Sequence, residues 1–301
     1  MFKKLSTELE KLRDVVVQYH TPLKDYTSFR IGGPADIFLI PLQNRVLPEI
    51  IAILNNYQQD FFILGKGSNI IVGDQGIRGV VIYNARLNNI IIKDGQITAE
   101  CGVTLAALAK QAMEAGLSGL EFASGIPGSL GGAIFMNAGA YGSEMKDIIV
   151  EVDVINNTGD VLTLNKQQLD LSYRHSILQE KSLIASRVKL KLAPGDREQI
   201  KAQMKKLNQQ RQEKQPLEWP SAGSVFKRPD GYYTGPLIEK AGLKGARVGD
   251  AQVSQKHAGF IINRGNATAR DVIELIKKVQ REVYQNSGIK LETEPRYIGE
   301  F

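Results

Sequence analysis

Two glycine-rich loops constrain what this chain can fold into. Residues 65–69 read Gly-Lys-Gly-Ser-Asn directly after the apolar run Phe61–Leu64, and residues 124–133 hold four glycines and a proline. Such backbone can turn its N–H groups toward phosphate without a side chain in the way. The first loop could equally be a plain strand-to-strand turn. Neither loop fits the Rossmann or P-loop spacing, so the pair predicts a less common dinucleotide-binding fold.

The hydrophobic pattern mixes strands and helices, which predicts an α+β chain. Residues 1–18 predict a polar amphipathic helix, residues 35–40 a strand closed by Pro41, and residues 44–56 a helix capped by Asn44. Further strands are expected at 61–64, 70–72, 80–83, 90–93, 96–101, 150–156, 161–164 and 183–192, and further helices at 104–115, 197–214, 235–241 and 268–286. The helix of 197–214 follows a Pro-Gly-Asp break and is expected to connect domains.

Composition excludes several function classes. The formal charge of +6 is scattered, so a basic cleft for a phosphorylated small molecule explains it better than nucleic-acid binding. Cys101 is the only cysteine, which excludes a disulfide framework and a cysteine-rich metal site and predicts a small core residue. No signal peptide and no apolar run of about 20 residues is visible, so we expect a cytoplasmic protein without a membrane or obligate protein partner.

Four motifs in order carry a resemblance to a known family. They are residues 26–36 (YTSFRIGGPAD), 64–69 (LGKGSN), 125–132 (GIPGSLGG) and 137–142 (NAGAYG). They resemble the FAD-binding half of the UDP-N-acetylenolpyruvoylglucosamine reductases, and the order and spacing of four motifs are far more specific than one glycine loop. The resemblance implies a two-part FAD domain of the vanillyl-alcohol-oxidase type and an α+β substrate-binding domain.

The resemblance also implies domain limits and cofactor contacts. The FAD-binding parts are expected at 1–85 and 86–200, the substrate-binding domain at 201–295, and residues 296–301 could join the first part. FAD is expected to be bound non-covalently, with no metal. The implied FAD-binding residues are Gly65, Gly67, Ser68, Asn69, Ile126, Gly128, Gly131, Gly132 and Ala133.

Three further segments resemble the family's catalytic motifs: 171–176 (LSYRHS), 221–227 (SAGSVFK) and 291–299 (LETEPRYIG). Singly, each is more often a surface charge or a plain loop. Jointly, they place the family's catalytic arginine, serine and glutamate at Arg174, Ser224 and Glu294.

The implied reaction explains these residue types. NADPH reduces FAD, and a hydride then goes to the methylene carbon of UDP-N-acetylglucosamine enolpyruvate, which gives UDP-N-acetylmuramate for peptidoglycan synthesis. Arg174 suits the carboxylate on which negative charge develops. Ser224 suits the proton donor to the carbanion. Glu294 is expected either to be partly protonated or to be held by a cation, because an ionised carboxylate would repel that of the substrate.

Neighbouring residues are expected to bind the UDP part. Tyr173, Lys227 and Arg228 are the candidates, although Arg228 departs from the family pattern, in which asparagine often follows the lysine. The short stretches around Arg174 and after Lys227 resemble the subgroup that lacks an extra loop whose tyrosine closes over the substrate.

Three other functions compete with this one. Another FAD-linked oxidase or dehydrogenase of the same superfamily would share the loops, and a non-catalytic nucleotide-binding protein would share them without flavin chemistry. A serine hydrolase is disfavoured, because no G-x-S-x-G elbow is present and none of the three histidines lies in a segment that suggests its base.

Overall fold

The computed structural model describes residues 2–301. They form two compact units. Unit 1 comprises the residues up to Tyr19, Ile37–Lys66 and Gly79–Gln210; unit 2 comprises His20–Asp36, Gly67–Arg78 and Arg211–Phe301. The division falls inside the helix α5, Arg197–Lys214.

The first sheet of the chain lies mainly in unit 1 and has the strand order β1-β2-β5-β3. Its strands are β1 (Val15–Pro22), β2 (Pro34–Pro41), β5 (Ile77–Tyr83) and β3 (Phe61–Leu64). Two helices, α1 (Phe2–Leu9) and α2 (Leu47–Asn56), share one hydrophobic core with it. β3 and β5 run parallel and end on the pair Leu64 and Tyr83, so both strands deliver their following residues to the same edge of the sheet.

The predicted helix over residues 1–18 is wrong beyond its first turns. α1 ends at Leu9, and Asp14 has a positive φ of 64° that turns the chain into β1. β1 opens with three β-branched valines, Val15–Val17, whose side chains favour strands. The predicted cap at Asn44 is also wrong, because residues 44–46 form a 3₁₀ turn and α2 begins at Leu47 with Pro48 in its first turn.

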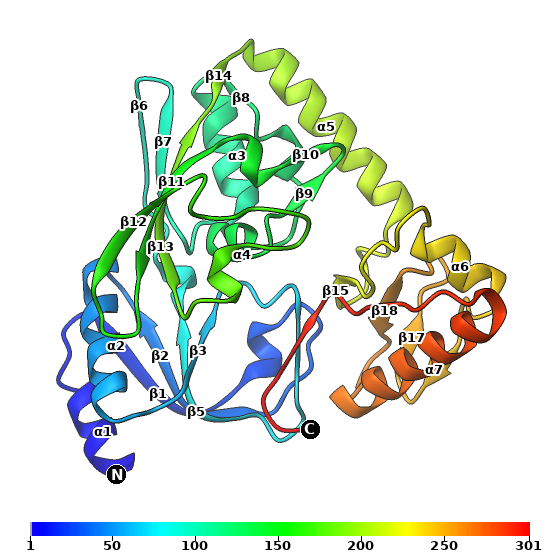
Figure 1. Ribbon diagram of the computed structural model, residues 1–301, viewed down its shortest axis with the longest axis horizontal. Helices are drawn as coiled ribbons and strands as arrows, with labels where there is room; N and C mark the ends of the chain where they lie inside the picture. The colour runs from blue at the N-terminus through cyan, green and yellow to red at the C-terminus, as the bar shows by residue number, and fades with distance from the viewer. Residues whose placement is uncertain (1) are drawn as a thin grey trace. The chain divides into compact units, whose positions relative to one another are not determined.

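The second sheet of unit 1 is antiparallel, with the order β12-β11-β13-β7-β6. Its strands are β6 (Ile90–Lys93), β7 (Gln96–Glu100), β11 (Ile149–Ile155), β12 (Val161–Asn165) and β13 (Ile184–Lys191). Helices α3 (Leu105–Glu114) and α4 (Leu130–Phe135) lie beside it and share its core (Figure 1). Thr104 caps α3 by accepting a hydrogen bond from the N–H of Ala107. Cys101 is a buried member of this core, which confirms its predicted place.

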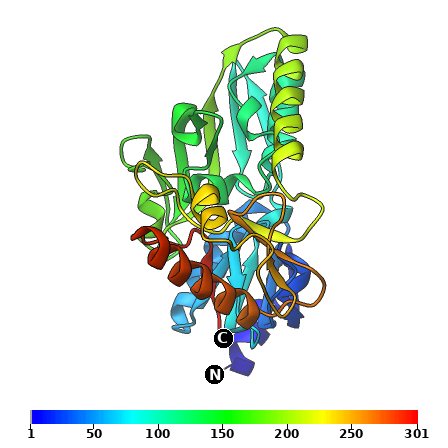
Figure 2. The same cartoon turned by 90° about the vertical axis from the view of Figure 1, so that its right-hand side faces the viewer.

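Unit 2 contains a four-stranded sheet of order β15-β18-β17-β16. Its strands are β15 (Ser221–Ser224), β16 (Arg247–Val248), β17 (Ala251–Val253) and β18 (Phe260–Asn263). Helices α6 (Thr234–Lys240) and α7 (Ala269–Ser287) lie next to each other in both views (Figures 1 and 2). The capping box of Thr268 and Asp271 starts α7, and Gly288, at φ 70°, ends it.

A separate parallel pair in unit 2 joins β4 (Ile70–Val72) to β19 (Arg296–Ile298). The remaining short elements are η1 (Leu23–Tyr26), η2 (Asn44–Val46), η3 (Asn84–Arg86), β8 (Leu117–Ser118), η4 (Glu121–Ala123), β9 (Gly139–Ala140), β10 (Ser143–Glu144), η5 (Met145–Asp147), η6 (Ile177–Gln179) and β14 (Ala193–Pro194). Within residues 2–301, no helix combines the length and the apolarity that crossing a membrane requires.

Candidate active site

The second glycine-rich loop is fixed in unit 1 by backbone hydrogen bonds to the segment that follows β7. The N–H of Leu130 donates to Val103 O at 2.7 Å, and the N–H of Gly131 donates to Cys101 O at 2.8 Å. A Cβ at Gly131 would lie 3.0 Å from the Cβ of Cys101, so glycine allows α4 to approach this strand end closely. The loop therefore has one well-defined conformation. It carries five of the predicted cofactor residues: Ile126, Gly128, Gly131, Gly132 and Ala133.

Gly65 brings the first loop against the second within unit 1. A Cβ at Gly65 would lie 2.2 Å from Oγ of Ser129 and 3.8 Å from Oδ1 of Asn84. Ser129 is buried and caps α4 by accepting from the N–H of Gly132. Asn84 is also buried, and its Oδ1 has no hydrogen-bond partner among the described residues. Two close glycine loops without acidic residues and an orphaned polar atom beside them fit a bound dinucleotide.

Replacing Gly65 by alanine should destabilise the fold and weaken FAD binding. The new methyl group collides with the Ser129 hydroxyl, and overpacking of this kind costs about 1–3 kcal/mol. Thermal unfolding of the apoprotein and FAD titration measure the two effects. Adding Ser129→Ala to Gly65→Ala removes Oγ of Ser129, the atom that the new methyl group would overlap, so the double variant should regain part of the lost stability. A double variant as unstable as Gly65→Ala would show that this overlap is not the cause.

Arg174 lies in a tight turn of unit 1. Ser172 and His175 exchange backbone hydrogen bonds of 3.2 and 3.1 Å across it, and Arg174 itself has a positive φ of 56°. A non-glycine residue with a positive φ costs conformational energy, and it persists only where the surrounding contacts hold it. The guanidinium lies 5.1 Å from the ring centroid of the exposed Tyr173.

Three polar side chains that the sequence analysis did not select fix this turn. Asn137, fully buried, donates from Nδ2 to Ser172 O at 3.0 Å and accepts at Oδ1 from the N–H of Lys146. Gln179 donates to Arg174 O at 3.0 Å, and the buried Ser176 donates to Phe135 O at 2.8 Å. Asn137 has φ 41°, a conformation that asparagine tolerates well, and its position in the NAGAYG motif was the available signal.

The rest of the first loop belongs to unit 2. Gly67 has a positive φ of 59°, and a Cβ there would lie 2.3 Å from Tyr26 O, so only glycine fits. Its carbonyl accepts the N–H of Ser28 at 3.1 Å. Asn69 continues into β4, and its carbonyl accepts the N–H of Arg296 at 3.1 Å. Ser68 lies between Gly67 and Asn69.

Main-chain pairing within unit 2 brings Glu294 beside Val225, the residue that follows Ser224. The N–H of Glu294 donates to Val225 O at 2.9 Å, and the N–H of Lys227 donates to Glu292 O at 2.8 Å. Residues 292–294 thus form an added antiparallel segment beside residues 225–227. Asn69 Nδ2 lies 3.5 Å from Glu294 O, so the main chain of Glu294 contacts both Asn69 of the first loop and Val225.

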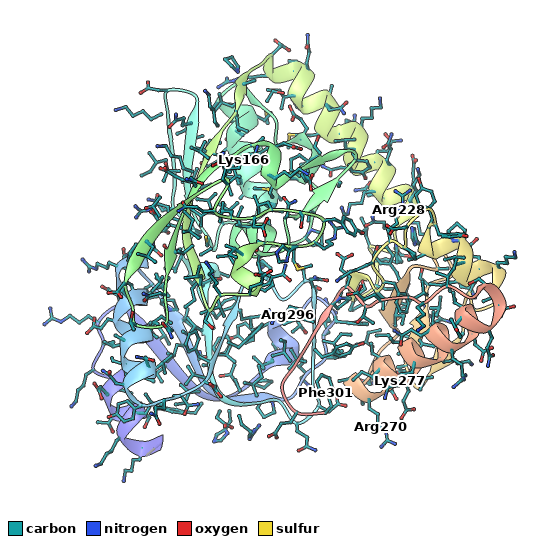
Figure 3. The ribbon with its side chains drawn as sticks, viewed as in Figure 1. Lys166, Arg228, Arg270, Lys277, Arg296 and Phe301 are labelled. Carbon is teal, nitrogen blue, oxygen red and sulfur yellow. The ribbon has the colours of Figure 1, made fainter. Side chains whose placement is uncertain are left out.

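The residues expected to bind the UDP part differ in their surroundings. Lys227 Nζ lies 2.5 Å from Oε1 of Glu292. Arg228 stacks on Tyr233, with its Cζ 3.9 Å from the ring centroid, and donates from Nε to Tyr232 O. Figure 3 labels Arg228 in the segment between β15 and α6 and Arg296 on β19, both in unit 2.

His257 supports β18 beside Ser224. Its Nδ1 accepts the N–H of Gly259 at 3.1 Å, and its ring meets Phe260 edge-on. Phe260 pairs with Ser224, and Gly259 O accepts the N–H of Val225. Burial lowers the pKa of His257 below its ordinary value of 6.5, so the ring is neutral at pH 7.

We expect acid to weaken unit 2 through this histidine. A lowered folded-state pKa means that the unfolded chain takes up the proton first. The stabilisation is complete above pH 6.5 and is lost as the pH falls from there through the lower folded-state value. Urea unfolding of wild type and His257→Gln between pH 8 and pH 5 should show a shallower decline for the variant; parallel curves would remove His257 from this role.

Among residues 2–301, no three histidine, cysteine or acidic side chains gather as metal ligands. Burial raises the pKa of the Cys101 thiol far above its ordinary value, which leaves it protonated and unreactive.

Comparison with known proteins decides the family. Residues 35–165 match the family model of an FAD binding domain, and residues 215–298 match that of the C-terminal domain of UDP-N-acetylenolpyruvoylglucosamine reductase. A reductase of that name from Caldanaerobacter subterraneus is 50% identical, over 97% of this chain and 98% of its own. The chain belongs to the UDP-N-acetylenolpyruvoylglucosamine reductase family.

Two further relatives agree with this membership. The reductase from Agathobacter rectalis is 48% identical over 97% of each chain. The crystal structure of the Thermus caldophilus reductase superposes with a TM-score of 0.81 at 36% identity and covers 94% of this chain and 98% of that one. The predicted α+β fold with an FAD-binding domain and a separate C-terminal domain is thereby confirmed.

Proposed function

We propose that this member of the reductase family is an NADPH-dependent enzyme that reduces UDP-N-acetylglucosamine enolpyruvate to UDP-N-acetylmuramate in peptidoglycan synthesis. The match of residues 215–298 to the reductase C-terminal domain favours this over another oxidase or dehydrogenase with a similar FAD domain. Its FAD-binding domain makes it a flavoprotein rather than a bare nucleotide binder. Action in the cytoplasm is part of the proposal.

The pairing of residues 292–294 with residues 225–227 is the observation that carries the assignment of roles. It supports the proposal because the main chain of Glu294 runs beside Val225, the residue that follows Ser224, on adjacent extended segments of unit 2. Arg174, held in its strained turn of unit 1, is the third member. We propose that the three act on one substrate.

The chemistry assigns each residue a task. Bound FAD, reduced by NADPH, supplies a hydride to the enolpyruvyl methylene carbon. Arg174 pairs with the substrate carboxylate through two parallel hydrogen bonds, which strengthen as negative charge spreads into that group. Ser224 then protonates the carbanion from one face, since so basic a carbanion accepts a proton from a weak acid.

Glu294 assists as a hydrogen-bond donor in its protonated form or as a carboxylate balanced by a cation. Its main chain is fixed by Val225, which limits where the carboxyl group can reach. An uncompensated negative charge there would oppose the charge that develops in the reaction. Either form of Glu294 avoids that repulsion.

The remaining contacts complete the proposal. FAD is held non-covalently by Gly65, Gly67, Ser68, Asn69, Ile126, Gly128, Gly131, Gly132 and Ala133. The UDP part is bound by Tyr173, Lys227 and Arg228, of which Lys227 exchanges its Glu292 partner for phosphate. We further propose the division into 1–85, with residues 296–301 as a candidate addition, 86–200 and 201–295, and membership of the subgroup without the extra tyrosine loop.

Anaerobic rapid mixing tests the function. NADPH should bleach the flavin absorbance of the purified enzyme, and the UDP-enolpyruvyl sugar should restore it, whereas small alcohols should not. Reoxidation by small alcohols would indicate another oxidase or dehydrogenase. A purified protein without flavin that takes up no added FAD would contradict the proposal outright.

A further inference from the structure

We propose that Asn84 is a cofactor-binding residue whose carboxamide hydrogen-bonds FAD. Asn84 directly follows Tyr83, the last residue of β5, as Gly65 follows Leu64 of β3. The two strands are parallel, so Asn84 and Gly65 leave the same sheet edge side by side. Ligands bind at such carboxyl ends of parallel strands.

The backbone of Asn84 is held where it lies. Asn84 O accepts the N–H of Leu87 at 2.9 Å, and a Cβ at Gly102 would lie only 2.0 Å from the same oxygen. The main chain is therefore packed tightly on one side. Oδ1 of the side chain lies near Gly65, 3.8 Å from where a Cβ of that residue would stand, and Oγ of Ser129 lies 2.2 Å from the same point.

The orphaned oxygen is unusual among the buried asparagines. Asn137 and Asn263 are also almost fully buried, and both use their amide nitrogen and their oxygen in hydrogen bonds. Asn84 is 5% exposed, yet Oδ1 has no partner among residues 2–301. A buried polar group without a partner costs stability, which points to a ligand that supplies the missing bond.

The chemistry of the carboxamide fits two parts of a dinucleotide. Its oxygen can accept from a ribose or ribityl hydroxyl, and after rotation about Cβ–Cγ its NH₂ can donate to a phosphate oxygen. The inference rests on the FAD binding of the proposed function and adds a residue that neither loop contains.

FAD titration of apoprotein, followed by flavin fluorescence, tests the inference. Asn84→Leu keeps the approximate size but removes the hydrogen bond, and the Kd for FAD should rise about 10- to 100-fold. Asn84→Ala, which cannot overpack, should show the same direction. Asn84→Asp separates the two contacts, because a phosphate repels the new charge whereas a hydroxyl still donates to it.

Apoprotein stability and a matched control sharpen the test. The melting temperature of the Asn84→Leu apoprotein should equal or exceed that of wild type, because a buried unpartnered oxygen is removed. A marked fall would reveal an internal partner and overturn the inference. Asn44→Leu removes another buried unpartnered oxygen, in the turn before α2, and should leave the Kd unchanged. If Asn84→Leu and Asn84→Ala bind FAD as tightly as wild type does, this inference alone is contradicted. If wild type binds no FAD, the proposed function is contradicted.

Discussion

Replacing Ser224 by alanine should leave the reduction of the flavin by NADPH intact and slow its reoxidation by the enolpyruvyl substrate by about 10²–10⁴-fold, the usual contribution of a positioned acid. The reason is that protonation of the carbanion belongs to the second half-reaction only. Stopped-flow absorbance of the flavin separates the two halves. Ser224 occupies the last position of β15, so the exchange of a hydroxyl for hydrogen should not disturb the pairing with Phe260.

Ser221→Ala is the matched control for Ser224. Ser221 begins the same strand. Its backbone carbonyl, rather than its hydroxyl, accepts the hydrogen bond from Ser28 Oγ at 2.6 Å, so the substitution leaves this bond in place. The control should keep both half-reactions near wild-type rates. Equal losses in both half-reactions of Ser224→Ala would remove this residue from the role of proton donor.

Replacing Arg174 by alanine should slow the second half-reaction by about 10²–10³-fold, the loss typical when one preorganised group that stabilises developing charge is removed. Arg174→Lys should recover only part of the rate, because an ammonium keeps the charge but cannot form two parallel hydrogen bonds to a carboxylate. The flavin spectrum and the FAD affinity should stay unchanged in both variants. A lysine variant with the full wild-type rate would show that only charge matters at this position.

The turn that carries Arg174 offers a check on this reading. Gln179 donates to Arg174 O, so Gln179→Ala loosens the turn without touching the guanidinium. The rate should fall less than in Arg174→Ala, because the functional group remains. A fall as large as that of Arg174→Ala would mean that the turn, rather than the guanidinium, limits the reaction.

Sequence reasoning was strong where a local pattern decides the structure. The helix over 197–214 and the strands at 61–64 and 70–72 follow from local sequence patterns, and the structure has them. The predicted helix was wrong at residues 10–18, where the amphipathic pattern suggested a helix but the β-branched residues Val15–Val17 favour a strand. The pairing of this strand with β2 could not be read from the local sequence.

Long-range pairing explains most of what the sequence could not give. Nothing near Glu294 indicates that its N–H bonds to Val225, almost 70 positions earlier, or that Arg296 pairs next to Asn69. Asn84 shows the same limit: it reads as an ordinary turn residue after β5, and only the packing of Gly65 and Gly102 around it reveals an orphaned oxygen. The motif resemblance supplied the proposed catalytic residues because it carries such pairings implicitly.

We propose that Arg174 of unit 1 and Ser224 of unit 2 act on the same substrate molecule. A double-mutant cycle on the rate of flavin reoxidation tests this directly, with wild type, Arg174→Lys, Ser224→Ala and the double variant. Residues that stabilise one transition state together are not additive. We predict that the double variant loses clearly less than the product of the two single losses. Losses that multiply in full would show that the two residues act independently and would contradict their joint action on one substrate molecule.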